Sequence, residues 1–196
     1  EHDDKHLLSA EIRSVSENVQ KPVRTLAVKI VAPSLSYTNG QIVVNIPNVR
    51  MPIPLFIVFR ALGILSDREI IQYCLLDLNK YESMMDLFIP SIHDASTIFT
   101  QRNALKYIAT HIKNGGETTS HALMILSDYF LPHIGETNYK AKAYYLGYIV
   151  FRMLCVHQNI EKPTDRDHFK YKRIELVGSL IYDLFREYYE MQLRYI

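Results

Sequence analysis

Residues 138–157 read NYKAKAYYLGYIVFRMLCVH, and this stretch decides the architecture expected for the chain. Its most apolar part, residues 143–156, is 14 residues long and contains Arg152. A helix that crosses a bilayer needs about 20 apolar residues, so this stretch is too short for a membrane span. It predicts instead a long buried helix, and Pro163 breaks the chain after it.

Helical patterns also fill most of the chain before this stretch. We expect helices over residues 55–62, 66–78, 82–88, 103–113 and 118–130. Gly63 is expected to end the first helix and Pro90 the third, and Asn114-Gly115-Gly116 closes the fourth. Ser66 is a good N-cap for the second helix, and Glu69 follows three residues later, as in a capping box.

A final helix is expected over residues 172–193. Its apolar stripe consists of Ile174, Val177, Ile181, Leu184, Tyr188 and Met191. Gly178 lies inside this helix, where it costs about 1 kcal/mol relative to alanine. A close packing contact at Gly178 would explain that cost.

The N-terminal part of the chain has a different pattern. Residues 1–10 are expected to form a loose polar lead-in. Residues 23–31 and 41–46 are rich in β-branched side chains and predict two strands. Asn39-Gly40 favours a turn with positive φ between them, so the two strands are expected to pair as a hairpin. The predicted fold is α+β and predominantly α-helical, with a small N-terminal β-hairpin.

Composition narrows the class of protein. The chain has 196 residues, a length that fits one domain or one large domain with an appendage, and 48% of them are hydrophobic. Its 22 basic and 21 acidic residues give a net charge of +1, so any contact with nucleic acid must come from a local patch. Cys74 and Cys155 stand in apolar surroundings and predict two buried reduced thiols in an intracellular protein.

The familiar catalytic motifs are absent from the sequence, including a phosphate-binding glycine-rich loop and a zinc-binding His-Glu-x-x-His pair. His93-Asp94 suggests the metal dyad of HD-type phosphohydrolases, but only His2 and His6 precede it, both in the polar lead-in. A solvated polar pair is the alternative. Cys155 and His157 point different ways on a helix and do not form a nucleophile with its base. We therefore expect no catalytic residue and no metal ligand here.

The densest polar cluster is residues 165–173, which read DRDHFKYKR. Basic side chains at a helix start can contact phosphates, and an aspartate can accept a hydrogen bond from a base amino group. The candidate DNA-binding residues are Arg166, Asp167, His168, Lys170, Lys172 and Arg173. A charged loop that only leads into a helix is the alternative.

This cluster also carries a family resemblance. Residues 165–169, followed by residues 172–180 and Leu184-Phe185, closely resemble a stretch of the second-largest subunit of eukaryotic, archaeal and large-DNA-virus RNA polymerases. Further blocks resemble that subunit in the same order: Glu11–Ser14, Ile53–Gly63, Phe130–Gly135 and Lys142–Tyr148. The resemblance covers nearly the whole chain.

The resemblance implies a place within a larger subunit. Residues 1–164 would form its lobe domain, and residues 165–196 would form a loop and a long helix that return to the protrusion domain. Because the lobe is inserted into the protrusion, the N- and C-termini are expected to lie close together. The polymerase is a nucleotidyltransferase, but its active-site magnesium is held by other parts, so no cofactor is expected in this fragment.

The resemblance also implies partners. These would be the rest of the same subunit, the other polymerase subunits, DNA near the downstream edge of the transcription bubble, and initiation or elongation factors such as a transcription factor IIF-like protein. The chain would lie with the transcription machinery, in the nucleus or, for a virus, in host cytoplasm or virion, and not in a membrane. A free-standing helical adaptor that binds only protein is the alternative function, and an HD-type metal hydrolase is a weaker one.

Lys170 departs from the family pattern, which usually has glycine after the His-Phe pair. If that position required positive φ, lysine would be strained there. Structural roles compete with DNA contact in this cluster. Asp167 is expected to cap a helix that begins near Phe169, and Arg173 to pair with an acidic side chain.

Overall fold

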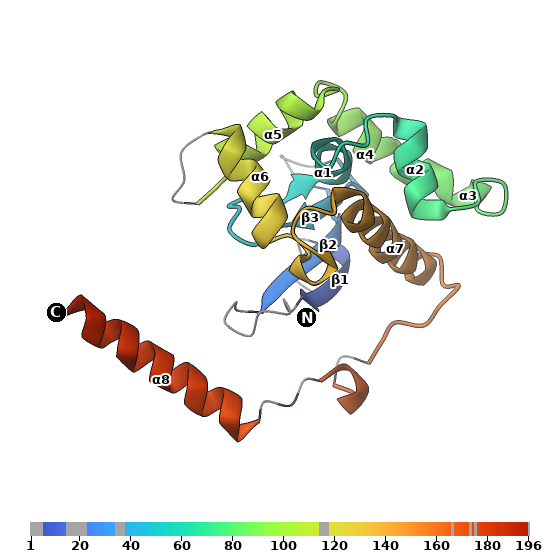
Figure 1. The fold of residues 1–196 in the computed structure, drawn as a ribbon. Coiled ribbons are helices and arrows are strands. Elements are labelled where there is room, and N and C mark those ends of the chain that lie inside the picture. Colours follow the sequence, from blue (N-terminus) through green and yellow to red (C-terminus); the bar gives the residue numbers. More distant parts are fainter. Residues whose placement is uncertain are drawn as a thin grey trace. The chain divides into compact units, whose positions relative to one another are not determined.

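The computed structural model describes residues 6–14, 23–33, 38–113, 118–165, 167–172, 174 and 176–195. The chain divides into two compact units, Glu1–Glu161 and Lys162–Ile196. The first unit contains a small sheet and most of the helices (Figure 1). The expected proximity of the termini concerns Glu1 and Ile196, which lie outside the described residues, so it stays a prediction.

A four-stranded antiparallel sheet, in the order β1-β2-β3-β4, forms the N-terminal part of the first unit. Its strands are β1 (His6–Ser14), β2 (Arg24–Val31), β3 (Ile42–Asn45) and β4 (Ile53–Pro54). The predicted hairpin is confirmed, because β2 and β3 pair with Val28 opposite Val44. Gly40 has φ of 79° in the turn before β3, as the Asn39-Gly40 pair predicted.

Strand β1 was not predicted, and the expected loose lead-in over residues 1–10 is wrong from His6 onward. Within the strand, Ile12 lies opposite Leu26 and Ala10 lies opposite Val28. The apolar residues alternate with polar ones, but the strand includes small residues with little β-propensity. Pairing with β2 therefore establishes this strand, and the sequence alone signals it weakly.

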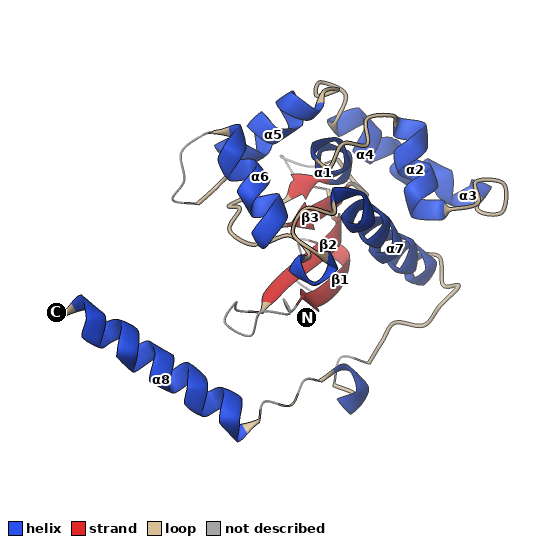
Figure 2. Ribbon diagram, viewed as in Figure 1, coloured by secondary structure: helices blue, strands red, loops and turns tan. Residues whose placement is uncertain are grey.

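Helices cover the rest of the first unit and form the second (Figure 2). They are α1 (Leu55–Ala61), α2 (Asp67–Leu75), α3 (Glu82–Met85), η1 (Asp86–Phe88), α4 (Ile89–Asp94), α5 (Gln101–Thr110), α6 (Thr119–Asp128), η2 (Pro132–Ile134), α7 (Tyr139–His157), η3 (Phe169–Tyr171) and α8 (Val177–Arg194). The predicted predominantly helical α+β fold is confirmed. The long helix is also confirmed, and it begins after Asn138, whose Oδ1 accepts a hydrogen bond from the Ala141 amide at 3.2 Å.

Three predictions about helix ends are wrong: the stop at Pro90, the capping box at Ser66 and the end of the second helix at residue 78. Pro90 does not end a helix but stands in the first turn of α4, where its missing N–H would have no helical partner in any case. Ser66 occupies the N-cap of α2, but its side chain makes no capping hydrogen bond, so the capping box with Glu69 does not form. Helix α2 ends at Leu75, three residues earlier than expected, because the next residue has positive φ.

The other helices differ from expectation mainly at their ends. Helix α5 begins before the predicted residue 103, because Thr100 caps it and accepts a hydrogen bond from the Asn103 amide at 3.3 Å. The predicted stop at residues 114–116 lies outside the described residues. Helix α8 begins at Val177 and not at residue 172, because Lys172 has extended backbone angles.

The core of the first unit is centred on α1, in which every residue is buried. This helix packs against β3, β4 and α5, and α7 packs against α2 and β1. Cys74 and Cys155 are both buried and free, which confirms the prediction of buried thiols. Burial raises the pKa of each thiol, so both are poor nucleophiles.

The close packing that was expected at Gly178 occurs at Gly147 instead. A Cβ atom on Gly147 would overlap the backbone carbonyl of Tyr73 in α2, whereas no described atom stands within 4 Å of a Cβ placed on Gly178. We expect Gly147→Ala to lower the free energy of unfolding by about 2 kcal/mol, because the backbones of α2 and α7 must separate.

Chemical denaturation checks this prediction, and Gly178→Ala is the matched control. The same substitution in α8 meets open space, so it should raise helical content by circular dichroism without loss of stability. Equal effects of the two substitutions on unfolding would contradict the packing role of Gly147.

None of the helices in the described part of the chain is long and apolar enough to cross a membrane.

Candidate nucleic-acid interface

The candidate site is a short turn in the second unit, formed by Asp165 and residues 167–172. Asp165 organises its beginning, because its Oδ1 accepts a hydrogen bond from the Asp167 amide at 2.9 Å and its carbonyl accepts one from the His168 amide at 3.3 Å. This is a local turn of the kind that aspartate favours. We call this segment the 165–172 turn.

The single-turn helix η3 follows within the 165–172 turn, and His168 caps it. The Nδ1 atom of His168 accepts a hydrogen bond from the Lys170 amide at 3.1 Å, so Nδ1 carries no proton in this arrangement. The expectation that Asp167 caps the helix is therefore wrong. Lys170 lies inside the right-handed η3 without positive φ, so lysine causes no backbone strain where the family usually has glycine.

The charged groups of the turn lie at the surface. Lys172 Nζ lies 3.1 Å from Asp167 Oδ1, and both side chains are exposed. Exposed pairs of this kind contribute little to stability, so both groups remain available to a ligand. The Lys170 ammonium lies 5.7 Å from the centre of the Tyr171 ring.

Two aromatic side chains extend from the same turn. Phe169 is 84% exposed and Tyr171 is 56% exposed. Sequence reasoning placed these residues in the cluster but did not single them out. Their alternation with Lys170 and Lys172 is the signal that could have identified them, since interleaved basic and aromatic residues are typical of nucleic-acid-binding surfaces.

The structure brings together four of the six candidate DNA-binding residues in this turn: Asp167, His168, Lys170 and Lys172. Arg166 and Arg173 lie outside the described residues, and so does any pairing of Arg173 with an acidic side chain. Contact of this turn with DNA stays a prediction.

Among the residues that the structure describes, no cluster of metal ligands accompanies the turn. Within the described ranges, no three His, Cys, Asp or Glu side chains gather as metal ligands would. His93 is exposed, and Asp94 accepts a hydrogen bond from the Thr38 hydroxyl at 2.9 Å. These residues form a surface polar pair, and they do not support the HD-type hydrolase hypothesis.

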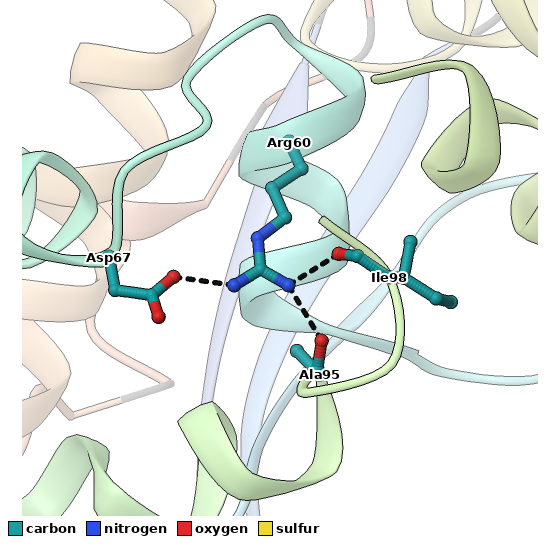
Figure 3. A network of polar contacts seen from close by, with 4 residues as sticks. All are labelled: Arg60, Asp67, Ala95 and Ile98. Atoms are coloured by element: carbon teal, nitrogen blue, oxygen red, sulfur yellow. Dashed lines mark hydrogen bonds and ion pairs between the residues drawn. The ribbon is translucent and has the colours of Figure 1, made fainter. Parts of the chain in front are cut away.

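The other blocks that carry the family resemblance have structural roles in the first unit. In the block Ile53–Gly63, Arg60 is buried and links three segments (Figure 3). Its Nη1 donates hydrogen bonds to the carbonyl oxygens of Ala95 and Ile98 at 2.6 and 2.5 Å, and its Nη2 lies 2.5 Å from Asp67 Oδ1. This side chain therefore ties α1 to α2 and to the segment after α4.

The block Phe130–Gly135 is tied to strand β1. The Ser14 hydroxyl lies 2.7 Å from His133 Nδ1, across 119 residues of sequence. Burial and the positive charge of Lys142 lower the pKa of His133. Leu131 has φ of 47°, a conformation that non-glycine residues rarely adopt and that the surrounding packing must hold.

The block Lys142–Tyr148 contains a buried lysine. Lys142 Nζ donates hydrogen bonds to the carbonyl oxygens of Leu126 and Ser127, at 2.7 and 2.8 Å, at the C-terminal end of α6. Burial lowers the pKa of Lys142 to about 8, although the nearby Asp128 and Glu136 oppose this shift. Arg60, His133 and Lys142 thus give three of the blocks a structural role, because each side chain connects segments that are distant in the sequence.

Comparisons with known proteins agree with the resemblance in the sequence. Residues 32–175 match the family model described as RNA polymerase Rpb2, domain 2. The chain is 38% identical over 183 residues to the DNA-directed RNA polymerase II subunit RPB2 of Encephalitozoon cuniculi. The aligned region covers 90% of this chain and 15% of that protein.

Relatives from other lineages give similar values. Identity is 37% over 191 residues to the DNA-directed RNA polymerase II subunit 2 of Arabidopsis thaliana, covering 93% of this chain and 16% of that protein. It is 37% over 153 residues to the subunit Rpo2 of the archaeon Saccharolobus solfataricus, covering 76% of this chain and 13% of that protein. The chain spans about 15% of the length of these relatives. It belongs to the family of domain 2 of the second-largest RNA polymerase subunit, as its motifs predicted.

Proposed function

We propose that this chain is the non-catalytic lobe part of the second-largest subunit of a DNA-directed RNA polymerase. The observation that carries the proposal is the family match over residues 32–175, in a chain that spans about 15% of its relatives. In this role the first unit is a rigid wall of the DNA cleft. Catalysis and the magnesium ion belong to other parts of the assembled enzyme.

The 165–172 turn is the proposed point of contact with DNA, near the downstream edge of the bubble. Lys170 and Lys172 would approach phosphates, and the exposed carboxylate of Asp167 would accept from a base amino group. The net charge of +1 gives the whole chain little attraction for DNA, so this contact depends on the position that the assembled polymerase gives to the turn.

Helix α8 supports an attachment to the rest of the subunit. Its apolar side chains are exposed in the second unit: Val177, Leu180, Ile181, Leu184, Phe185, Tyr188, Met191 and Leu193. A stripe of this size needs an apolar partner. We propose that the rest of the protrusion domain, to which this helix returns, covers the stripe. Polymerase subunits and initiation or elongation factors would dock on the first unit, and the protein would reside with the transcription machinery.

A reconstituted polymerase that carries Lys170→Ala with Lys172→Ala tests the DNA contact. We expect weaker binding of a bubble template, and a slope of log affinity against log salt that is smaller by about one to two. The exposed lysines of the first unit supply the control, Lys80→Ala with Lys106→Ala, which should leave the slope unchanged. Equal slopes for both variants would remove DNA contact from the proposal.

The size of the native polypeptide tests membership in the polymerase. An antibody against this chain should detect a band several times larger than 22.8 kDa that co-fractionates with RNA synthesis. A band near 22.8 kDa, separate from that activity, would favour the free-standing adaptor instead.

A further inference from the structure

Helix α7 is unusual in its charges. Its 19 residues contain no aspartate or glutamate. The basic side chains are Lys140, Lys142, Arg152 and His157, and only Lys142 is buried. The helix therefore presents cations alone to its surroundings.

Four exposed residues of α7 form one row along the helix. Lys140, Tyr144, Tyr148 and Arg152 are spaced four residues apart, so they share a face. Tyr144 is 49% exposed and Tyr148 is 51% exposed. We call these four residues the tyrosine row, in which a cation at each end brackets two half-exposed rings. Figure 1 shows α7 along one side of the first unit.

Neighbouring side chains hold the tyrosine row in place. The Tyr144 ring stacks on the Tyr73 ring of α2, with centroids 4.2 Å apart and an angle of 22° between the rings. Arg152 Nε lies 2.9 Å from Glu161 Oε2, and Arg152 Nη1 lies 3.3 Å from the Tyr148 hydroxyl. A surface that is already ordered loses little entropy when a partner binds.

The composition of the tyrosine row is that of a protein-binding surface. Tyrosine and arginine are enriched at the energetic centres of protein interfaces, because each offers a large apolar area together with a polar tip. The rings of Tyr144 and Tyr148 contribute only half of their area to the fold. The other half is available for contact.

We propose that the tyrosine row docks an acidic amphipathic segment of a partner protein, whose apolar side chains cover the two rings and whose carboxylates face Lys140, away from the Arg152–Glu161 pair. This inference rests on the factor-docking part of the proposed function, and it identifies the surface and the chemistry of the partner. Complementary charge at the Lys140 end supports it, since α7 itself contains no carboxylate and Glu161 lies at the other end of the row, paired with Arg152.

A nucleic acid fits the tyrosine row less well. One face of the Tyr144 ring is already covered by Tyr73, so that ring cannot stack between bases. Glu161 already neutralises Arg152, so Lys140 is the one cation of the row left to meet phosphates. Few counterions would be released, and counterion release supplies most of the affinity for nucleic acids.

Fluorescence anisotropy with a labelled peptide tests the proposal on the 196-residue chain. The probe is an amphipathic peptide of about 18 residues, with leucine and phenylalanine on one face and glutamate and aspartate on the other. A second peptide replaces every carboxylate by its amide. We expect the acidic peptide to bind about tenfold or more tightly than the amide peptide, with a difference that shrinks in high salt.

Lys140→Glu is the decisive variant, because an acidic residue in the first turn of a helix is favourable and folding should be kept. We expect it to weaken binding of the acidic peptide about tenfold. Tyr148→Ser should weaken binding of both peptides. Arg102→Glu is the matched control, since Arg102 is the exposed second residue of α5 as Lys140 is of α7, and it should leave binding unchanged.

Three results would overturn the proposal. The first is equal binding of the two peptides, and the second is equal effects of Lys140→Glu and Arg102→Glu on binding of the acidic peptide. The third is binding of oligothymidine that is as tight as binding of the acidic peptide and is weakened as much by Lys140→Glu. The last result would make this a surface for polyanions. The test needs no assembled polymerase. Its failure is therefore separate from a failure of the lysine variants in the 165–172 turn, which is read from DNA binding.

Discussion

Replacement of Arg60 by methionine is expected to lower the free energy of unfolding by about 3 kcal/mol. Methionine has a similar volume but no donors. The buried carbonyl oxygen of Ala95 and the partly buried one of Ile98 would lose their hydrogen bonds to Arg60, and Asp67 would lose its cation (Figure 3). A buried acceptor without a donor costs about 1–3 kcal/mol, and the partly buried carbonyl of Ile98 and the unpaired carboxylate of Asp67 add smaller costs.

Urea denaturation of the 196-residue chain measures this effect. Arg68→Met is the control, because Arg68 is an exposed residue of the neighbouring helix α2, and its loss should change stability by less than about 0.5 kcal/mol. Arg60→Lys should fall between the two, since an ammonium group cannot reach three acceptors with the fixed fork of a guanidinium. If Arg60→Met lowered the free energy of unfolding by less than about 1 kcal/mol, the contacts of Arg60 would not be important for stability.

The burial of Arg60 and its contacts could not be predicted from the sequence. The apolar run of residues 55–62 predicted α1 correctly, because periodicity reports which segment is buried. Charged residues are almost never fully buried unless paired, so a sequence offers no reason to place Arg60 inside. Its acceptors at Ala95 and Ile98 are 35 and 38 residues away and belong to the backbone, which no residue type reveals.

The errors at element ends have a similar cause. Pro90 was read as a stop, although proline is equally suited to the first turn of a helix, and only the position of α4 decides between these uses. Strand β1 depends on its pairing with β2 more than on its own propensity. The long apolar pattern of α7, by contrast, is compatible only with a buried helix. Its predicted start at Asn138 agrees with the structure, in which Asn138 is the N-cap.

The candidate site was predicted from its density of charged residues and from the family resemblance that the same residues carry, but its geometry was not predicted. Spacing alone left the 165–172 turn as a charged loop. Whether Lys170 needed positive φ depended on η3, which is held by the hydrogen bond to His168. A three-residue helix has too few periods to be detected from sequence.

Lys142 provides the second large effect, and it depends on pH. Burial lowers the pKa of Lys142 to about 8 in the folded state, while an unfolded lysine titrates near about 10.4. Between these values the folded chain has released the proton and the unfolded chain still holds it. Unfolding then takes up a proton, so the contribution of Lys142 to the free energy of unfolding rises with pH, by up to about 1.4 kcal/mol per unit.

We therefore expect Lys142→Met to become more destabilising as pH rises, from about 1 kcal/mol near pH 7 to about 3 kcal/mol near pH 9.5. The neutral amine has two N–H donors, which match the two carbonyl oxygens of Leu126 and Ser127, and methionine would leave both oxygens without a donor. Below the folded-state pKa the cost of burying an ammonium offsets part of this gain.

Unfolding of the two chains at several pH values measures the difference. Tyrosines and cysteines that titrate in the same range are present in both chains, so their contributions cancel. Lys140→Met is the control, because Lys140 lies two residues earlier on the exposed face of α7, and its effect should not change with pH. If the cost of Lys142→Met stays constant or shrinks as pH rises, then Lys142 is charged in the folded protein, and its bonds to the end of α6 act as charge-assisted contacts.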